Sequence, residues 1–151
     1  MEELSVDFEP FVDDEVRKFI DDGIDNHNIA VTGLPAYFPT NFVLRSERGD
    51  VLGGLLGTIW GGWLHVGTLW VSEIVRGQGH GSALLEAAEA YARARDCTGI
   101  FVDTFSFQAR PFYERHGFTC FATQADYPKG HARHFLEKRL AQSTMGSGGI
   151  T

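Results

Sequence analysis

The chain lacks several features that mark specialised classes of protein. Its 151 residues contain only two cysteines, Cys97 and Cys120, too few for a disulfide framework or a cysteine-based metal cluster. The formal net charge is −7, whereas a nucleic-acid-binding protein needs a basic surface. The first residues carry neither the basic nor the apolar segment of a secretion signal. We therefore expect a cytoplasmic protein with reduced cysteines, no bound metal and no nucleic-acid partner.

A membrane-spanning helix is not expected either, although one stretch is long enough for it. Residues 51–72 contain no formally charged side chain. Six glycines interrupt this stretch, and the pair Gly61-Gly62 is typical of a hairpin turn. The stretch therefore predicts two buried strands and no contact with a membrane.

The composition is that of one soluble globular domain. Hydrophobic residues make up 43% of the chain and charged residues 22%, which is ordinary for a protein with a single core. We expect this domain to span residues 1–140. Residues 141–151 are rich in Gly and Ser and are predicted to form a flexible C-terminal tail.

Hydrophobic periodicity predicts an α/β (α+β) fold in which a strand, a glycine-rich turn, a helix and a parallel strand follow one another. The expected strands cover residues 4–8, 41–47, 51–60, 63–71, 100–104, 118–123 and 131–140. The expected helices run from Asp13 to about residues 26–28, over residues 83–95, and from a cap at Ser106 to Gly117. Residues 32–39 are expected to form a loop that either covers the core or lines a binding site.

The most informative stretch is the turn that precedes the second helix. Three glycines, Gly77, Gly79 and Gly81, alternate with other residues between an apolar run and an Ala-rich run. Glycines at the start of a helix leave backbone N–H groups exposed and let a phosphate approach them. The spacing G-x-G-x-G differs from the dinucleotide-binding fingerprint, and no Gly-Lys-Ser/Thr follows as in a P-loop.

Two motifs in this sequence resemble those of the GNAT N-acetyltransferase superfamily. Arg76-x-x-Gly79-x-Gly81 is similar to the family's R/Q-x-x-G-x-G/A signature. The segment from Ser106 to Phe118 is similar to the family's N-x-x-A-x-x-F-Y-x-x-x-G-F pattern. The motifs occur in the family's order with one strand between them, and the resemblance extends from about residue 41 to residue 140.

This resemblance implies a fold and a cofactor. The fold would be a single GNAT domain whose mixed sheet has about six to seven strands, helices on both faces and a splayed pair of parallel strands. The cofactor would be acetyl-CoA, with its pantetheine arm along the strand edge and its pyrophosphate on the glycine turn. The implied cofactor-binding residues are Leu69, Trp70, Val71, Arg76, Gly77, Gln78, Gly79, His80, Gly81, Ser82 and Ser106.

The resemblance also implies catalytic roles. Tyr113 occupies the position of the tyrosine with which the family often protonates the departing thiolate, although a core aromatic residue would also fit there. Ser106 replaces the family's asparagine, which puts one cofactor contact in doubt. A base must deprotonate the amine, and Glu73 is our first candidate, with His65, Asp103 and ordered water as alternatives.

The acceptor is left open by the sequence, apart from its chemical class. We expect a small neutral or cationic amine in a pocket formed by three converging segments, with a protein or peptide amine as the alternative. The aromatic residues of those segments are Tyr37, Phe38, Trp60, Trp63 and Tyr127. A non-catalytic acyl-CoA-binding module is the rival function, and a homodimer is compatible with the sequence.

Overall fold

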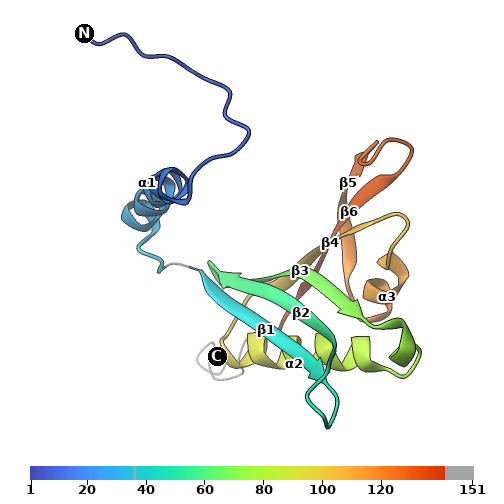
Figure 1. The fold of residues 1–151 in the computed structure, drawn as a ribbon. Helices are drawn as coiled ribbons and strands as arrows, with labels where there is room; N and C mark the ends of the chain where they lie inside the picture. The colour runs from blue at the N-terminus through green and yellow to red at the C-terminus, as the bar shows by residue number, and fades with distance from the viewer. Residues whose placement is uncertain (36, 142–151) are drawn as a thin grey trace, which may run out of the picture. The chain divides into compact units, whose positions relative to one another are not determined.

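The computed structural model describes residues 1–35 and 37–141, and the chain divides into two units, Met1–Ala36 and Tyr37–Thr151. Among the described residues, no helix is both long and apolar enough to cross a membrane. The predicted tail lies, apart from Ala141, outside the described residues. Figure 1 shows the elements: α1 (Asp14–Thr32), β1 (Phe38–Arg45), β2 (Val51–Trp60), β3 (Trp63–Val71), the 3₁₀ turn η1 (Glu73–Val75), α2 (His80–Ala94), β4 (Gly99–Phe105), α3 (Arg110–Arg115), β5 (Thr119–Ala125) and β6 (Ala132–Arg139).

The first unit contains one helix and, among its described residues, no strand. Residues 4–8 form no strand, so that prediction is wrong. Alternating apolar and polar residues produce a strand only where another segment accepts the backbone hydrogen bonds, and this unit offers no such segment. Helix α1 starts as predicted but runs beyond residue 28. It ends where Gly33, at φ 69°, donates its N–H to the carbonyl of Ile29.

The larger unit is built on one six-stranded sheet in the order β1-β2-β3-β4-β6-β5. Each neighbouring pair is antiparallel except β3 and β4, which are parallel as the strand–helix–strand pattern predicted. Gly61 and Gly62 form the predicted hairpin turn between β2 and β3. Strand β1 begins at Phe38, earlier than expected, because Phe38 already pairs with Ile59 of β2.

The core lies between α2 and one face of the sheet, and Figure 1 shows α2 running along that face. The helix contributes the predicted apolar stripe, of which Leu84, Leu85, Ala88 and Ala92 are buried. Fully buried side chains of the strands meet them, chiefly Leu55, Leu64, Val66, Ile100, Val102 and Leu136. Both cysteines are free, with Cys97 buried and Cys120 half-buried.

Helix α3 lies on the same face as α2, because Ser82 of α2 is hydrogen-bonded to His116 directly after α3. Within the larger unit, the described residues place no helix on the other face. The expectation of helices on both faces therefore stays a prediction. We call the face away from α2 the second face. It bears Asn41, Thr58, His65, Asp103 and Arg133 from five different strands.

Strands β3 and β4 pair over only part of their lengths. Their pairing ends at Val66 and Val102, after which β3 continues to Val71 beside β2 and β4 continues to Phe105 beside β6. At the same place Gly67 is an extra residue in β3, opposite the step from Leu56 to Gly57. Such a bulge bends a strand, so the last residues of β3 diverge from β4 and leave an unpaired backbone edge.

Candidate active site

The unpaired edge of β3 runs directly into the glycine turn, which we define as residues 72–79. Gly77 and Gly79 have φ values of 75° and 82°, in the left-handed region that non-glycine residues seldom adopt. Gly79 is the N-cap of α2 and makes no side-chain capping bond. The first N–H groups of the helix have no partner within the helix, so this turn suits an anionic group such as a phosphate.

The side chains around the turn brace it. Arg76 donates from Nε to the carbonyl of Val71, 2.8 Å away, and so ties the turn to the end of β3. Ser82 shares a 2.9 Å hydrogen bond with Nε2 of His116. A Cβ placed on Gly81 would lie 3.6 Å from the ring of Phe112, an ordinary contact distance. Gly81 therefore lies close to α3. At position 79, in contrast, a glycine is needed because of the left-handed backbone angle.

Tyr113 lies on α3, close to this region, and is 5% exposed. Burial, with a smaller effect from the negative charge of Asp103, raises the pKa of Tyr113 to about 12. Its hydroxyl group makes no hydrogen bond to any described residue. Tyr113 therefore keeps its proton at neutral pH, and no described residue accepts that proton in a hydrogen bond.

The other two residues predicted from the motifs are placed differently. Ser106 does not cap α3, which begins after Ala109, so that prediction is wrong. Ser106 instead exchanges hydrogen bonds with Ala132 at the start of β6, at 2.8 and 3.0 Å, because β4 stays paired with β6 up to this point. Glu73 begins η1 directly after β3 and is exposed to solvent.

A chain of three side chains crosses the second face at the point where β3 and β4 separate. His65 of β3 places Nε2 3.2 Å from Oδ1 of Asp103 on β4. Arg133 of β6 donates to Oδ2 of the same carboxylate from Nε and Nη2, at 3.0 and 2.7 Å. The ring of His65 stacks on Phe101, with centroids 4.5 Å apart and planes 5° from parallel. The imidazole is therefore held in one orientation.

The carboxylate of Asp103 remains ionised in this arrangement. Burial is the largest single influence and would raise its pKa, but hydrogen bonds and charge from Arg133 and His65 together lower the pKa below its ordinary value. Asp103 is thus a stable negative partner for the imidazole of His65 at neutral pH.

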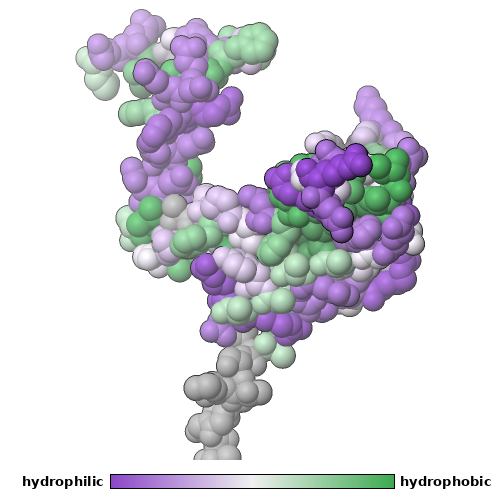
Figure 2. All heavy atoms as spheres, turned by 60° about the horizontal axis from the view of Figure 1, so that its bottom comes forward, coloured by the Kyte–Doolittle hydropathy of each residue, from purple (hydrophilic) through white to green (hydrophobic). Residues whose placement is uncertain are grey.

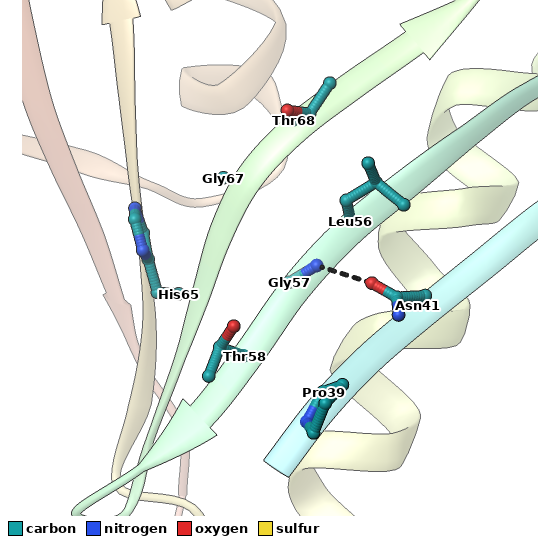
Figure 3. A pocket seen from close by; sticks show the side chains of 8 residues that line it. All are labelled: Pro39, Asn41, Leu56, Gly57, Thr58, His65, Gly67 and Thr68. Atoms are coloured by element: carbon teal, nitrogen blue, oxygen red, sulfur yellow. Dashed lines mark hydrogen bonds between the residues drawn. The ribbon is translucent and has the colours of Figure 1, made fainter. Parts of the chain in front are cut away.

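A pocket of about 350 Å³ lies on the second face beside the bulge, and we call it the Gly67 pocket. Figure 3 shows that its walls come from β1, β2 and β3, with His65 on the side towards β4. In the same view Oδ1 of Asn41 accepts a hydrogen bond from the N–H of Gly57 at 3.2 Å. The lining residues are Pro39, Asn41, Leu56, Gly57, Thr58, His65, Gly67 and Thr68.

The aromatic residues predicted to surround the acceptor do not converge. Tyr37 and Trp60 lie together, with ring centroids 5.7 Å apart, and Trp63 pairs with Gly99 at the start of β4. Tyr127 instead contacts Phe105 at the other end of β4. Six residues of strand separate the two ends, which corresponds to about 20 Å. That prediction of convergence is wrong, because the strand register places Trp63 and Tyr127 at opposite ends of β4.

Sequence reasoning missed the Gly67 pocket and the role of Arg133. None of the five predicted acceptor residues lines this pocket. Exposed aromatic side chains are a weak signal for a binding site because they are common on this protein. Figure 2 shows hydrophobic residues reaching the surface between hydrophilic ones. The better signal was His65, the single histidine of the otherwise uncharged β3 and already one of the alternative bases.

Comparison with known proteins identifies the family. Residues 2–118 match the Acetyltransferase (GNAT) family. The chain belongs to this family. By that membership it is an acetyltransferase. The glycine turn before α2 and the diverging parallel strands β3 and β4 occur at the positions that the resemblance to this family predicted.

The relatives are acetyltransferases as well. The chain is 47% identical to a blasticidin-S acetyltransferase of Streptomyces morookaense over 95 residues, 62% of this chain and 70% of that protein. It is 39% identical to the acetyltransferase Atu2258 of Agrobacterium fabrum over 128 residues, 85% of this chain and 93% of that protein.

Solved structures share the fold. A crystal structure from Agrobacterium tumefaciens has a TM-score of 0.85 at 36% identity, covering 91% of this chain and all of that one. A Bacillus anthracis structure in complex with acetyl coenzyme A has a TM-score of 0.61 at 17% identity, covering 68% of this chain and 63% of that one. The second likeness concerns the fold alone.

Proposed function

We propose that this GNAT acetyltransferase transfers the acetyl group of acetyl-CoA to a primary amine of a small molecule by direct attack. The observation that carries the proposal is the unpaired edge of β3 running into a glycine turn that opens α2. This one stretch offers backbone hydrogen-bonding groups for an amide-containing arm and, next to them, N–H groups for a phosphate.

The residues present fit acetyl-CoA. Leu69, Trp70 and Val71 would bind the pantetheine arm through their backbone, and the segment Arg76–Ser82 would hold the pyrophosphate. The left-handed glycines and the uncapped start of α2 support this assignment. The hydroxyl oxygen of Ser106 accepts a hydrogen bond from the N–H of Ala132. The hydroxyl proton of Ser106 can still be donated to a cofactor. Bound acetyl-CoA supplies a thioester carbonyl that an amine can attack.

Two side chains are proposed to handle protons. Tyr113 donates its proton to the departing thiolate, and its raised pKa supports this role because the hydroxyl is protonated at neutral pH. The amine must first lose a proton. Glu73, exposed after the end of β3, can do so directly or through water.

The acceptor class is supported by one relative. A blasticidin-S acetyltransferase, 47% identical over the matched residues, is named for a small-molecule substrate. The Gly67 pocket has the size of a small-molecule site and lies next to the diverging strands. A protein or peptide amine stays the alternative acceptor.

Thiol release from acetyl-CoA, measured with a panel of small amines and with peptides, tests the proposal. We expect turnover with one class of small amine and little with peptides. Binding of acetyl-CoA by calorimetry without turnover on any amine would favour the non-catalytic acyl-CoA-binding module. Turnover confined to peptide N-termini would retain the donor and overturn the acceptor.

A further inference from the structure

His65 combines features that no other titratable side chain of the described second face shows together. Its ring lines the Gly67 pocket and its side chain is 41% exposed, so a bound molecule can reach it. Stacking on Phe101 and the bond to Asp103 fix the plane and direction of the ring. It also lies one residue before Val66, the last residue of β3 that pairs with β4.

The bond to Asp103 determines what His65 can do. A carboxylate only accepts hydrogen bonds, so neutral His65 carries its proton on Nε2 and leaves Nδ1 with a free lone pair. When Nδ1 takes a proton, the negative charge of Asp103 stabilises the resulting imidazolium. Arg133 holds the carboxylate in place and keeps it ionised.

We propose that the Gly67 pocket is the acceptor site and that His65, oriented by Asp103 and Arg133, is the base that deprotonates the acceptor amine. In this step the ammonium N–H bond breaks, the proton goes to Nδ1 of His65, and the nitrogen lone pair becomes free to attack. This inference rests on the proposed function and gives His65 the role for which Glu73 was the first candidate.

The lining of the pocket indicates the chemistry of the acceptor. Asn41 uses its amide oxygen for Gly57, which leaves its amide N–H groups as donors, and Thr58 and Thr68 add hydroxyl groups. Among the described residues that line the pocket, His65 alone is ionisable. The acceptor is therefore a small amine that carries hydroxyl or carbonyl groups near its nitrogen.

The decisive experiment compares His65→Gln with Glu73→Gln, with His131→Gln in the loop before β6 as a matched control that does not line the pocket. We expect His65→Gln to lower kcat by about a hundred-fold, within the range of general base catalysis, while the KM for acetyl-CoA stays within about two-fold. An amide can donate as well as accept a hydrogen bond, so Asp103→Asn no longer fixes the tautomer of His65 that is protonated on Nε2. This variant should lower kcat by a similar factor. Thermal unfolding verifies that each variant is folded.

The pH dependence separates a base from a structural residue. Among the described residues of this surface, the charged groups that face His65 are Asp103 and Arg133, together with Glu137, which pairs with Phe101 in the sheet, and Arg139 at the end of β6. Because a protonated imidazole cannot accept the proton, protonation of His65 should lower the rate of the wild-type chain and give its pH profile an acid limb. That limb should disappear in His65→Gln, leaving only the titration of the acceptor amine itself.

Acceptor selectivity tests the pocket. The probes are an amino alcohol and an alkylamine of equal length, and the variant is Thr58→Val, which removes a hydroxyl group at nearly constant shape. We expect the KM of the amino alcohol to rise several-fold and that of the alkylamine to stay unchanged. Equal KM changes for both amines would overturn the polar-acceptor assignment.

The outcomes distinguish the role of His65 from the acetyltransferase activity itself. If Glu73→Gln abolishes turnover and His65→Gln keeps both the rate and the acid limb, His65 is not the base, and the acetyltransferase proposal stands. If the wild-type chain releases no thiol with any amine, the proposed function fails and the role of His65 fails with it.

Discussion

The glycine turn with the start of α2 occupies one continuous stretch of the chain. The Gly67 pocket, in contrast, has walls from three strands, and the Asp103 and Arg133 side chains that orient its His65 come from two more. The turn presents mainly backbone groups, and the pocket presents side chains. A site made of backbone should tolerate changes of side chain but not of backbone angle. A site made of side chains should behave in the opposite way.

The largest effect should come from breaking the backbone site at Gly79. Its φ of 82° is strongly unfavourable for a β-branched residue, so Gly79→Val should weaken acetyl-CoA binding by about a hundred-fold or more. Gly49→Val is the matched control, because Gly49 has a similar φ of 89° but lies in the turn between β1 and β2, outside the cofactor-binding segment. Calorimetry measures both, and unchanged affinity in Gly79→Val would contradict the phosphate-binding role of the turn.

The next effect concerns Tyr113, which belongs to neither region and is proposed to act on the leaving group. Tyr113→Phe keeps the packing of the ring and removes the hydroxyl group. We expect kcat to fall by about ten-fold or more while acetyl-CoA affinity is retained. Steady-state kinetics decide this, with Tyr91→Phe on α2 as the control. An equal loss of affinity would indicate that Tyr113 only supports the structure.

The raised pKa of Tyr113 also predicts a loss of stability in alkali. The folded-state value is about 12 and the ordinary value is 10.0, so the neutral hydroxyl stabilises the fold fully below pH 10. That contribution is lost as the pH rises from 10 to 12. At pH 11 the wild-type chain should lose about 1 kcal/mol of unfolding free energy that Tyr113→Phe does not lose. Urea unfolding at pH 8 and pH 11 measures the difference.

The smallest effect should come from the side chains that brace the backbone site. Ser82 and His116 share a hydrogen bond of 2.9 Å, so Ser82→Ala and His116→Ala should each weaken acetyl-CoA binding only by about three- to ten-fold. The double variant should be no weaker than the worse single variant, since both remove one bond. His116→Gln can donate to Ser82 and should recover affinity. Additive losses would show that the bond does not matter for binding.

The two regions also differ in how far the sequence revealed them. The glycine turn was predicted from its own residues, because Gly77, Gly79 and the helix start that they serve are neighbours in the chain. Ser106 shows the limit of such reasoning. It precedes a helix and has the chemistry of a cap, yet it is held by Ala132, a residue of a strand whose register no local pattern specifies.

The remaining errors have the same origin. Residues 4–8 have the alternation of a strand but find no pairing partner within their unit. Tyr127 and Trp63 were both expected near the acceptor, and the pairing of β4 places them at opposite ends of that strand. Alternation and aromatic content describe a segment, whereas a site depends on which segments become neighbours.

The sequence by itself determined the order of the elements of the larger unit, the parallel β3–β4 pair, the glycine turn and the family, because each follows from residues close together in the chain. The tertiary structure alone decided that His65, Asp103 and Arg133 form one chain of hydrogen bonds and that a pocket opens beside Gly67. His65 and Arg133 lie 38 and 30 residues away from Asp103 in the chain, and only the sheet register brings both side chains within 3.2 Å of its carboxylate. Register is fixed by the pairing of whole strands, so no residue of the site encodes it alone.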